Sequence, residues 1–559
     1  MSEKIWLASY PPGVPPEVDV AALASVAECA ELAFRDFGGR DAYVQMGRAI
    51  TFAQLDALSA AFGAWLQQQG LGRGDRIAIM LPNTLQYPIA MLGALRAGLA
   101  VVNTNPLYTS PELEHQLTDS GASAVVVLAN FAHVLAQVLP RTQVRRVIVT
   151  EVGDLLGFPK GAVVNFVVRR RGIPRWRIPG AVRFREVLAA GARLKLERPA
   201  LNHDDIAFLQ YTGGTTGIAK GAVLTHGNIC ANVLQALAWI RPFLPDATAK
   251  PRCLVTPIPL YHIFALTANC LVFLRLGWTN VLITNPRDFP AFVKELRRYP
   301  FAYLSGVNTL FNALMNTTGF DKLDFSHLEV TLGGGMAVQE AVATRWKAVT
   351  GKPLTQAWGL TETSPGACIN IPFTDFNGSI GLPISSTEIA IKDDAGADLG
   401  VGQVGEICVR GPQVMRGYWN RPDETAQVML PQGWLRTGDI GRMDAGGFVY
   451  LEDRKKDMIL VSGFNVYPNE VEGVIAAHPG VREVAAVAQP DARSGETVAV
   501  FVVRKDPALT EREIIDWCRK SLTGYKLPRH VYFREELPKS NVGKILRRAL
   551  REQLPQVRG

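Results

Sequence analysis

The chain of 559 residues lacks several patterns that mark specialised classes of protein. Its seven cysteines are scattered without any C-x-x-C pair, which argues against a zinc site and against a disulfide framework. It has no internal repeat and no low-complexity tract. Its first residues mix charges and reach Pro11 and Pro12 before any apolar run, unlike a secretory signal peptide. We therefore expect a cytoplasmic protein.

Charged residues are missing from one long segment. The 22 residues 253–274 contain no Asp, Glu, Lys or Arg and could cross a bilayer as a helix. However, Pro257 and Pro259 interrupt the first third of the segment, and His262 and Asn269 would lie in lipid without partners. We expect a buried strand, turn and helix instead.

An excess of positive charge is concentrated in one window. The chain has a formal net charge of +8, and residues 151–200 contain eleven Lys or Arg against four acidic residues. Apolar and aromatic side chains alternate with these cations, which favours contact with anionic lipid head groups. We expect no nucleic-acid partner, because no groove-reading element is visible. A solvated, irregular surface insertion explains the window equally well.

The order of apolar patterns predicts an α/β fold. Up to about residue 450, strand-like runs alternate with amphipathic helical stretches, as in 76–81 followed by 87–99. This alternation predicts parallel-type β-sheets covered by helices. From about 380 to 452, short strands separated by Gly and Pro predict a small β-barrel or sandwich.

The last hundred residues form a separate pattern, typical of an α+β unit. A helix begins near Pro468, and a capping box at 510–513 opens a second helix. The charged run 452–457 comes directly before this unit and has the character of a linker. We expect an N-terminal domain over 1–452, a hinge over 453–457 and a C-terminal domain over 458–559.

One short run is suited to holding a polyphosphate. Residues 209–221 read Leu-Gln-Tyr-Thr-Gly-Gly-Thr-Thr-Gly-Ile-Ala-Lys-Gly. Glycines let backbone N–H groups approach phosphate oxygens, threonine hydroxyls add donors, and Lys220 supplies a positive charge. The spacing is not that of the common P-loop, because Ala219 stands where the second glycine would be. Taken alone, 213–217 could equally form a flexible hairpin turn.

Five further segments carry residues suited to catalysis. They read Pro-Leu-Tyr-His at 259–262, Leu-Gly-Gly-Gly at 332–335, Trp-Gly-Leu-Thr-Glu-Thr at 358–363, Gly-Trp-Leu-Arg-Thr-Gly-Asp at 433–439, and Pro-Lys-Ser-Asn-Val-Gly-Lys at 538–544. In isolation, each key residue has an ordinary structural explanation. In this order, the segments closely resemble the adenylate-forming superfamily of acyl-CoA synthetases, peptide adenylation domains and luciferases. The resemblance is closest to bacterial long-chain fatty acid–CoA ligases, whose fatty-acyl signature is similar to residues 433–459.

This resemblance covers essentially the whole chain. It implies a large domain of two parallel-type sheets plus a small β-barrel, followed by a small mobile domain. It also implies a two-step reaction. A free fatty acid and ATP form acyl-AMP and pyrophosphate, after which CoA takes the acyl group and releases AMP. ATP, Mg²⁺ and CoA are therefore the implied cofactors and co-substrates.

The resemblance assigns roles to residues of this chain. The implied catalytic residues are Lys544, Glu362, Thr361 and His262, with Glu362 also a ligand of Mg²⁺. The implied nucleotide and CoA contacts are Tyr211, Thr212, Gly213, Gly214, Thr215, Thr216, Gly217, Lys220, Gly333, Gly334, Gly335, Trp358, Gly359, Asp439, Arg454, Ser462, Gly463, Phe464 and Asn465. Lys456 aligns with the hinge residue. Trp358 is a departure, because the family usually has a tyrosine stacked on adenine there.

Several alternatives stay open. A medium-chain or aryl acyl-CoA ligase shares every nucleotide motif, whereas an amino-acid-activating domain is disfavoured because no aspartate stands beside His262. A sensor that binds acyl-AMP or a fatty acid without turnover is a remote alternative, since the charged site residues are all present. If the substrate is a fatty acid, we expect 151–200 to contact the inner face of the membrane reversibly. A homodimer is considered, and acyl chain length is not fixed.

Overall fold

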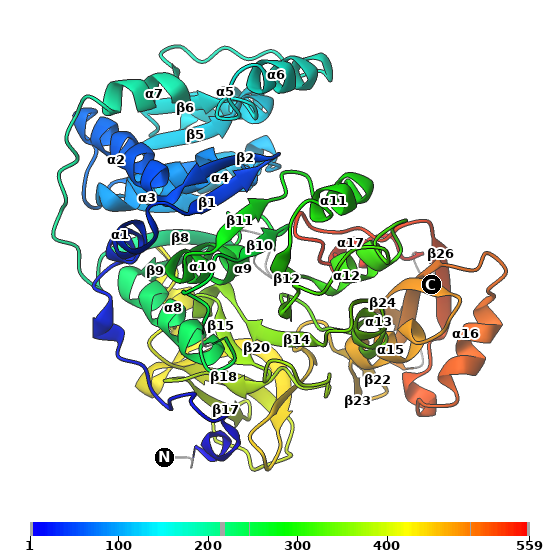
Figure 1. The fold of residues 1–559 in the computed structure, drawn as a ribbon. Helices are drawn as coiled ribbons and strands as arrows, with labels where there is room; N and C mark the ends of the chain where they lie inside the picture. Colours follow the sequence, from blue (N-terminus) through cyan, green and yellow to red (C-terminus); the bar gives the residue numbers. More distant parts are fainter. Residues whose placement is uncertain (1–3, 213–218, 245, 492–493, 556–559) are drawn as a thin grey trace.

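The computed structural model describes residues 4–212, 219–244, 246–491 and 494–555 (Figure 1). The implied phosphate contacts Gly213, Gly214, Thr215, Thr216 and Gly217 lie outside these residues. The described strands form four sheets, two in the first 383 residues, a third up to residue 454 and a fourth after it. All four sheets contribute residues to the cavity described below.

The largest sheet has nine strands and is mainly parallel. Its order is β16 (Leu382–Pro383), β15 (Gly366–Ile369), β14 (Leu354–Gly359), β13 (Val330–Gly333), β12 (Phe301–Gly306), β10 (Cys253–Thr256), β11 (Thr279–Leu282), β1 (Asp41–Gln45) and β2 (Arg48–Thr51). The pairs at its two ends are antiparallel, namely β1 with β2 and β14 through β16.

The second sheet has seven strands, and only its last pair, β8 with β9, is antiparallel among the described pairs. Its order is β7 (Val182–Arg183), β6 (Arg146–Thr150), β5 (Ala124–Leu128), β3 (Arg76–Met80), β4 (Ala100–Asn103), β8 (Ile206–Thr212) and β9 (Lys220–Thr225). The two parallel-type sheets expected from the sequence and the family resemblance are thus confirmed.

Helices cover these sheets. They are α1 (Val26–Phe37), α2 (Phe52–Gln68), α3 (Gln86–Arg96), α4 (Ser110–Ser120), α5 (Ala132–Val138), α6 (Lys160–Arg170), α7 (Phe184–Gly191), α8 (His226–Ile240), α11 (Phe289–Leu296), α12 (Asn308–Met315) and α13 (Glu340–Thr350). Helices α2 and α3 pack closely because each has a glycine at the contact. A Cβ on Gly63 would lie 2.6 Å from the carbonyl oxygen of Gly93, so any side chain there would separate the helices.

The uncharged segment 253–274 is buried inside the large part of the molecule. It forms β10, then a turn, then α9 (Ile263–Ala265), one π-helical turn (Leu266–Leu271) and the start of α10 (Val272–Leu276). The buried strand, turn and helix expected there are confirmed. Across the described ranges, no helix combines the length and apolar character that a membrane span requires.

The third sheet is antiparallel, as expected. It contains β17 (Glu388–Lys392), β18 (Gly405–Arg410), β20 (Trp434–Met443), β19 (Met429–Leu430) and β21 (Val449–Arg454), and α14 (Pro422–Val428) precedes β19. For 380–452 the sequence predicted a small β-barrel or sandwich, and the structure has a small antiparallel sheet there, in which no pairing among the described strands joins the two ends.

The fourth sheet belongs to the C-terminal unit, at the right of Figure 1. It contains β22 (Ile459–Val461), β23 (Phe464–Val466), β24 (Val481–Asp491), β25 (Gly495–Arg504) and β26 (His530–Arg534), with α15 (Pro468–Ala476), α16 (Glu511–Cys518) and α17 (Arg547–Arg551). The capping box expected at Thr510 and Glu513 opens α16. The two apolar clusters of this unit contain only residues from 459 onward, so it has its own core.

Candidate active site

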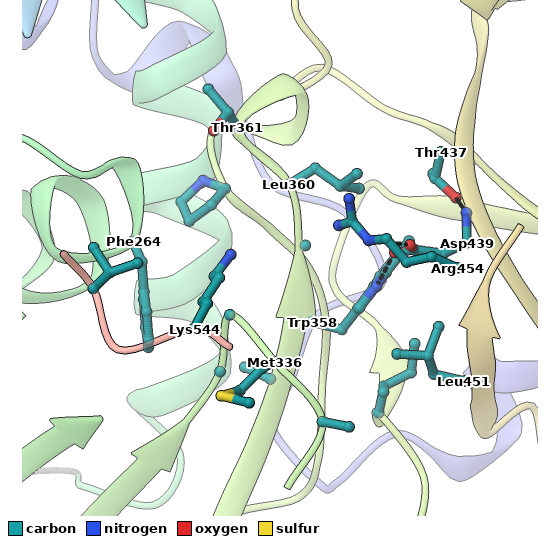
Figure 2. A pocket seen from close by; sticks show the side chains of 18 of the residues that line it. Phe264, Met336, Trp358, Leu360, Thr361, Thr437, Asp439, Leu451, Arg454 and Lys544 are labelled. Atoms are coloured by element: carbon teal, nitrogen blue, oxygen red, sulfur yellow. Dashed lines mark hydrogen bonds and ion pairs between the residues drawn. The ribbon is translucent and has the colours of Figure 1, made fainter. Parts of the chain in front are cut away.

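A single cavity of about 1090 Å³ lies between the large part of the chain and the C-terminal unit (Figure 2). Strands β8, β9, β14, β20 and β21 and the loop before α17 all contribute to its wall. The cavity gathers most of the residues to which the sequence assigned a role: Tyr211, Thr212, Lys220, His262, Gly334, Gly335, Trp358, Gly359, Thr361, Glu362, Asp439, Arg454, Lys456 and Lys544.

Other expected residues do not line this cavity. Gly333 packs inside the sheet, where a Cβ would lie 2.5 Å from Leu354 Cδ2. Ser462, Gly463, Phe464 and Asn465 belong to the β22–β23 hairpin of the C-terminal unit, and the ring of Phe464 stacks on Tyr525 with centroids 4.8 Å apart. In this arrangement the hairpin is therefore separate from the cavity.

The carboxylate of Asp439 organises one side of the cavity. It accepts a hydrogen bond of 2.9 Å from the indole Nε1 of Trp358 through Oδ2. Its Oδ1 lies 3.0 Å from Nε of Arg454, which is its direct neighbour in the β20–β21 register. The backbone N–H of Asp439 donates to Thr437 Oγ1 at 3.1 Å, so the strand itself orients the side chain (Figure 2).

Lys544 reaches into the cavity from the opposite side (Figure 2). Its loop is closed by a hydrogen bond of 2.7 Å from the Ser540 N–H to the Lys544 carbonyl oxygen. The same loop contacts the large part of the chain, because Thr309 Oγ1 donates to the Gly543 carbonyl oxygen at 2.8 Å. The aliphatic stem of Lys544 passes over Gly335, where a Cβ would lie 3.4 Å from Lys544 Cε.

Charges around the cavity set the protonation of Lys544 and His262. Burial lowers the pKa of the Lys544 amine to about 8, the guanidinium of Arg454 acts in the same direction, and the carboxylates of Asp439 and Glu362 oppose it. Burial and the charge of Lys544 lower the pKa of His262 to about 3. At neutral pH the amine is therefore mostly cationic and the imidazole is neutral.

Two residues that the sequence did not single out contact Glu362 and Lys220. Tyr418 donates its hydroxyl to Glu362 Oε1 at 2.8 Å, and its ring lies 5.3 Å from the amine of Lys220. Glu424, at the start of α14, forms an ion pair with Lys220. Glu424 stands in the charged run Arg-Pro-Asp-Glu at 421–424, but nothing in that run points to Lys220, so only the fold reveals their proximity.

Glu362 fits a Mg²⁺ ion that is held mainly by phosphate oxygens. Such an ion takes one or two protein carboxylates and fills its remaining positions with phosphate and water. Glu362 lines the cavity in the short helical turn Thr361–Thr363, and Tyr418 occupies only its Oε1.

One part of the cavity lining consists mainly of apolar residues, and we call this part the apolar arm. It comprises Asn232, Ala236, Ile263, Thr267, Ala268, Ile369, Ile380 and Ile384. These residues come from helix α8, from the segment after His262, and from β15 with the residues after it. An alkyl chain would find apolar contacts along most of this arm.

Comparison with known proteins gives matches along nearly the full chain. Residues 31–419 match the AMP-binding enzyme family, and residues 470–544 match the AMP-binding enzyme C-terminal domain. A long-chain-fatty-acid–CoA ligase of Escherichia coli O157:H7 is 54% identical over 555 residues, which cover 99% of this chain and 98% of that protein.

Solved structures share the fold. A crystal structure of an anthranilate CoA ligase in complex with anthranoyl-AMP has a TM-score of 0.85 at 23% identity, covering 96% of this chain and 99% of that one. The structure of ATP-bound MatB from Rhodopseudomonas palustris has a TM-score of 0.79 at 27% identity, covering 94% and 98%.

The arrangement predicts that the amine of Lys544 titrates near pH 8 and not near its ordinary value of about 10.4. Competitive labelling with acetic anhydride, read by mass spectrometry, measures this value directly. Replacing Arg454→Gln removes a repelling cation and should raise the pKa, whereas Asp439→Asn removes an attracting anion and should lower it further. Shifts of the opposite sign would contradict the electrostatics described above.

Proposed function

The chain belongs to the AMP-binding enzyme family, and we propose that it joins a long-chain fatty acid to CoA through an acyl-AMP intermediate. One observation carries this proposal. The cavity holds the cation Lys544, the Asp439 carboxylate with its indole and guanidinium partners, and an apolar arm in one continuous space. These are the parts needed to bring a nucleotide and an alkyl carboxylate together.

The first half-reaction brings together two anions, the carboxylate of the fatty acid and the triphosphate of ATP. Its rate therefore depends mainly on positioning and on charge neutralisation. We assign the ribose hydroxyls to the Asp439 carboxylate and the adenine face to the Trp358 indole. Lys544 faces the point where the carboxylate oxygen would attack the α-phosphorus, and its charge stabilises the negative oxygens there. Lys220 lies on the β9 side and would hold the departing pyrophosphate.

A polyphosphate that binds Lys220 must replace the carboxylate that pairs with this lysine in the structure. In the structure Glu424 neutralises this lysine. A polyphosphate carries more negative charge than one carboxylate and would displace it. Glu362 supplies the protein ligand for Mg²⁺, which when bound neutralises phosphate charge. His262 is neutral and donates no proton at physiological pH, so we assign it to shaping the carboxylate pocket.

The second half-reaction needs a different arrangement. CoA must reach the acyl carbonyl, and the hairpin residues 462–465 proposed to guide its thiol do not line the cavity. We propose that the C-terminal unit, 458–559, turns about Lys456 within the hinge 453–457 and exchanges Lys544 for this hairpin. The backbone supports this location, since Lys455 N–H still bonds to the Gly438 carbonyl oxygen at 2.9 Å. Ile459 already begins the other sheet.

A ligation assay tests the function and the division of labour together. The wild-type protein should release AMP with CoA and free acids between about C12 and C18, and give little with C4 or with aromatic acids. Lys544→Ala should lower acyl-AMP formation by about 10²- to 10³-fold, as for loss of one preorganised charge. It should leave conversion of supplied acyl-AMP to acyl-CoA near wild type. Preference for an aryl acid, or equal loss of both steps, would reject the assignment.

The apolar arm predicts a residue that limits chain length. Ala236 lines the arm from α8, so Ala236→Phe should fill its far part. Each displaced methylene costs about 0.8 kcal/mol of binding, and four would lower kcat/KM for a C16 acid by roughly 200-fold while sparing short acids. Ala238→Phe is a matched control, because Ala238 lies on the same helix and does not line the cavity. A uniform loss for all acids would argue against this role.

We also propose that the protein contacts anionic membranes from the cytoplasmic side. Helix α6 lies at the outer end of the seven-stranded sheet in Figure 1, and Phe158, Val163, Phe166 and Val167 beside and on it are exposed. Phe158 is 93% exposed. Arg169 is committed to Glu151, at 2.5 Å, whereas Arg170 packs 4.8 Å over the ring of Phe166. Apolar rings flanked by free cations suit the interface of an anionic bilayer.

Sedimentation with vesicles tests this contact. The double variant Phe158→Ser/Phe166→Ser should bind phosphatidylglycerol vesicles several-fold more weakly than wild type, and phosphatidylcholine vesicles should bind neither. Val401→Ser/Val404→Ser removes comparably exposed apolar side chains from another surface and is the control. If the Phe158→Ser/Phe166→Ser variant sedimented with phosphatidylglycerol vesicles as strongly as wild type, the proposed membrane contact would be rejected.

A further inference from the structure

A carboxylate of the large part of the chain is bound by the C-terminal unit. Asp453 belongs to β21 and pairs with Ile440 in the third sheet. Its side chain is nevertheless fully buried, because it points under the C-terminal unit. One oxygen accepts the backbone N–H of Asn469 at 2.7 Å, and the other lies 3.6 Å from Nη1 of Arg547.

Asp453 serves as a cap for α15 from outside the helix. The residue before this helix, Tyr467, makes no capping bond with its side chain, and Pro468 at the first position has no N–H. The first free N–H is therefore that of Asn469, which donates to Asp453. A carboxylate at this end also interacts favourably with the helix dipole.

Arg547 connects this contact to the catalytic loop. It follows Lys544 by three positions and begins α17. Its guanidinium bonds both oxygens of Glu472, at 2.9 and 3.0 Å, and the side-chain oxygen of Asn469 at 2.9 Å. It also lies 3.6 Å from Asp457. Arg547 therefore ties the loop that carries Lys544 to the start of α15.

The residues that contact Arg547 fall into two groups, according to whether they come before or after Lys456 in the chain. Asp457, Asn469 and Glu472 follow Lys456 and would turn together with Arg547. Asp453 precedes Lys456 and would stay behind. A rotation about Lys456 would thus break the contacts of Asp453 with Asn469 and Arg547. It would keep the hydrogen bond of 2.7 Å that Asp453 accepts from the Arg454 N–H, and it would leave the remaining partners of Arg547 in place.

Resting on the function proposed above, we propose that Asp453 is a latch that holds the C-terminal unit in the orientation where Lys544 enters the cavity. It is a positioning residue for acyl-AMP formation and has no part in thioester formation. Burying a carboxylate costs desolvation, which also raises the pKa of Asp453, and the new contacts offset this cost only in part. Such a latch favours one arrangement without locking it.

Asp453→Asn tests the latch, because the amide keeps the size of the side chain and removes its charge. Fatty-acid-dependent exchange between ATP and pyrophosphate should fall several-fold, as expected for loss of the negative charge at the start of α15 and beside Arg547. Conversion of supplied acyl-AMP and CoA to acyl-CoA should stay within about twofold of wild type. Equal losses in the two half-reactions would overturn the proposal.

Asp457→Asn is the matched control. Asp457 is also a buried carboxylate, and it contacts Arg547 and Arg551 within the C-terminal unit. Because these partners move together, this variant should affect the two half-reactions equally. A split like that of Asp453→Asn would show that general loss of charge, and not a latch, is responsible.

Amide hydrogen exchange gives a readout that needs no activity. Peptides covering 540–547 should exchange faster in Asp453→Asn than in wild type or in Asp457→Asn, while β24 and β25 stay protected if the unit is folded. If Asp453→Asn proves unstable, Asp453→Ser keeps an oxygen acceptor at the helix start and supports the same comparison. Unchanged exchange over 540–547 would overturn the latch. Absence of fatty-acid-dependent exchange in wild type would instead reject the proposed function.

Discussion

The carboxylate of Asp439 lies between the indole N–H of Trp358 and the guanidinium of Arg454, at 2.9 and 3.0 Å. This contact joins the nine-stranded sheet, which carries Trp358, to the antiparallel sheet, which carries Asp439 and Arg454. Because the anion is buried, it needs both partners to offset the loss of water. The two sheets are therefore held together at one side of the cavity, opposite Lys544.

The three cations of the site are divided between the large part of the chain and the C-terminal unit, and this division limits their mutual repulsion. Lys220 and Arg454 belong to the large part, whereas Lys544 arrives on the C-terminal unit. A single rigid cluster of three cations would repel itself before any anion bound. The structure avoids this, because Glu424 neutralises Lys220, Asp439 neutralises Arg454, and burial weakens the charge on Lys544.

Much of this could be predicted from the sequence, and the exceptions have physical causes. Local periodicity gave the parallel-type sheets, the buried segment 253–274 and the capped helix α16, since these depend on neighbours in the chain. The family resemblance marked most of the residues that line the cavity, because its motifs are local runs of sequence, although Gly333 and residues 462–465 do not line it. The contacts of Tyr418, Glu424 and Asp453 could not be predicted, because each of these residues contacts a partner that only the tertiary fold brings near. The sequence also left open whether the strands of 380–452 form a barrel or a sandwich, since strand composition does not reveal which edges pair.

The hydrogen bond between Trp358 and Asp439 bears on how well the acyl-adenylate is protected from hydrolysis. An acyl-adenylate is an energy-rich mixed anhydride that water destroys. Trp358 and Asp439 are 7% and 2% exposed, and both belong to the large part of the chain. The grip on the nucleotide end would therefore persist while the other unit turns. The acyl-adenylate would therefore stay bound and shielded from water until the CoA thiol attacks, so that little of it is lost by hydrolysis.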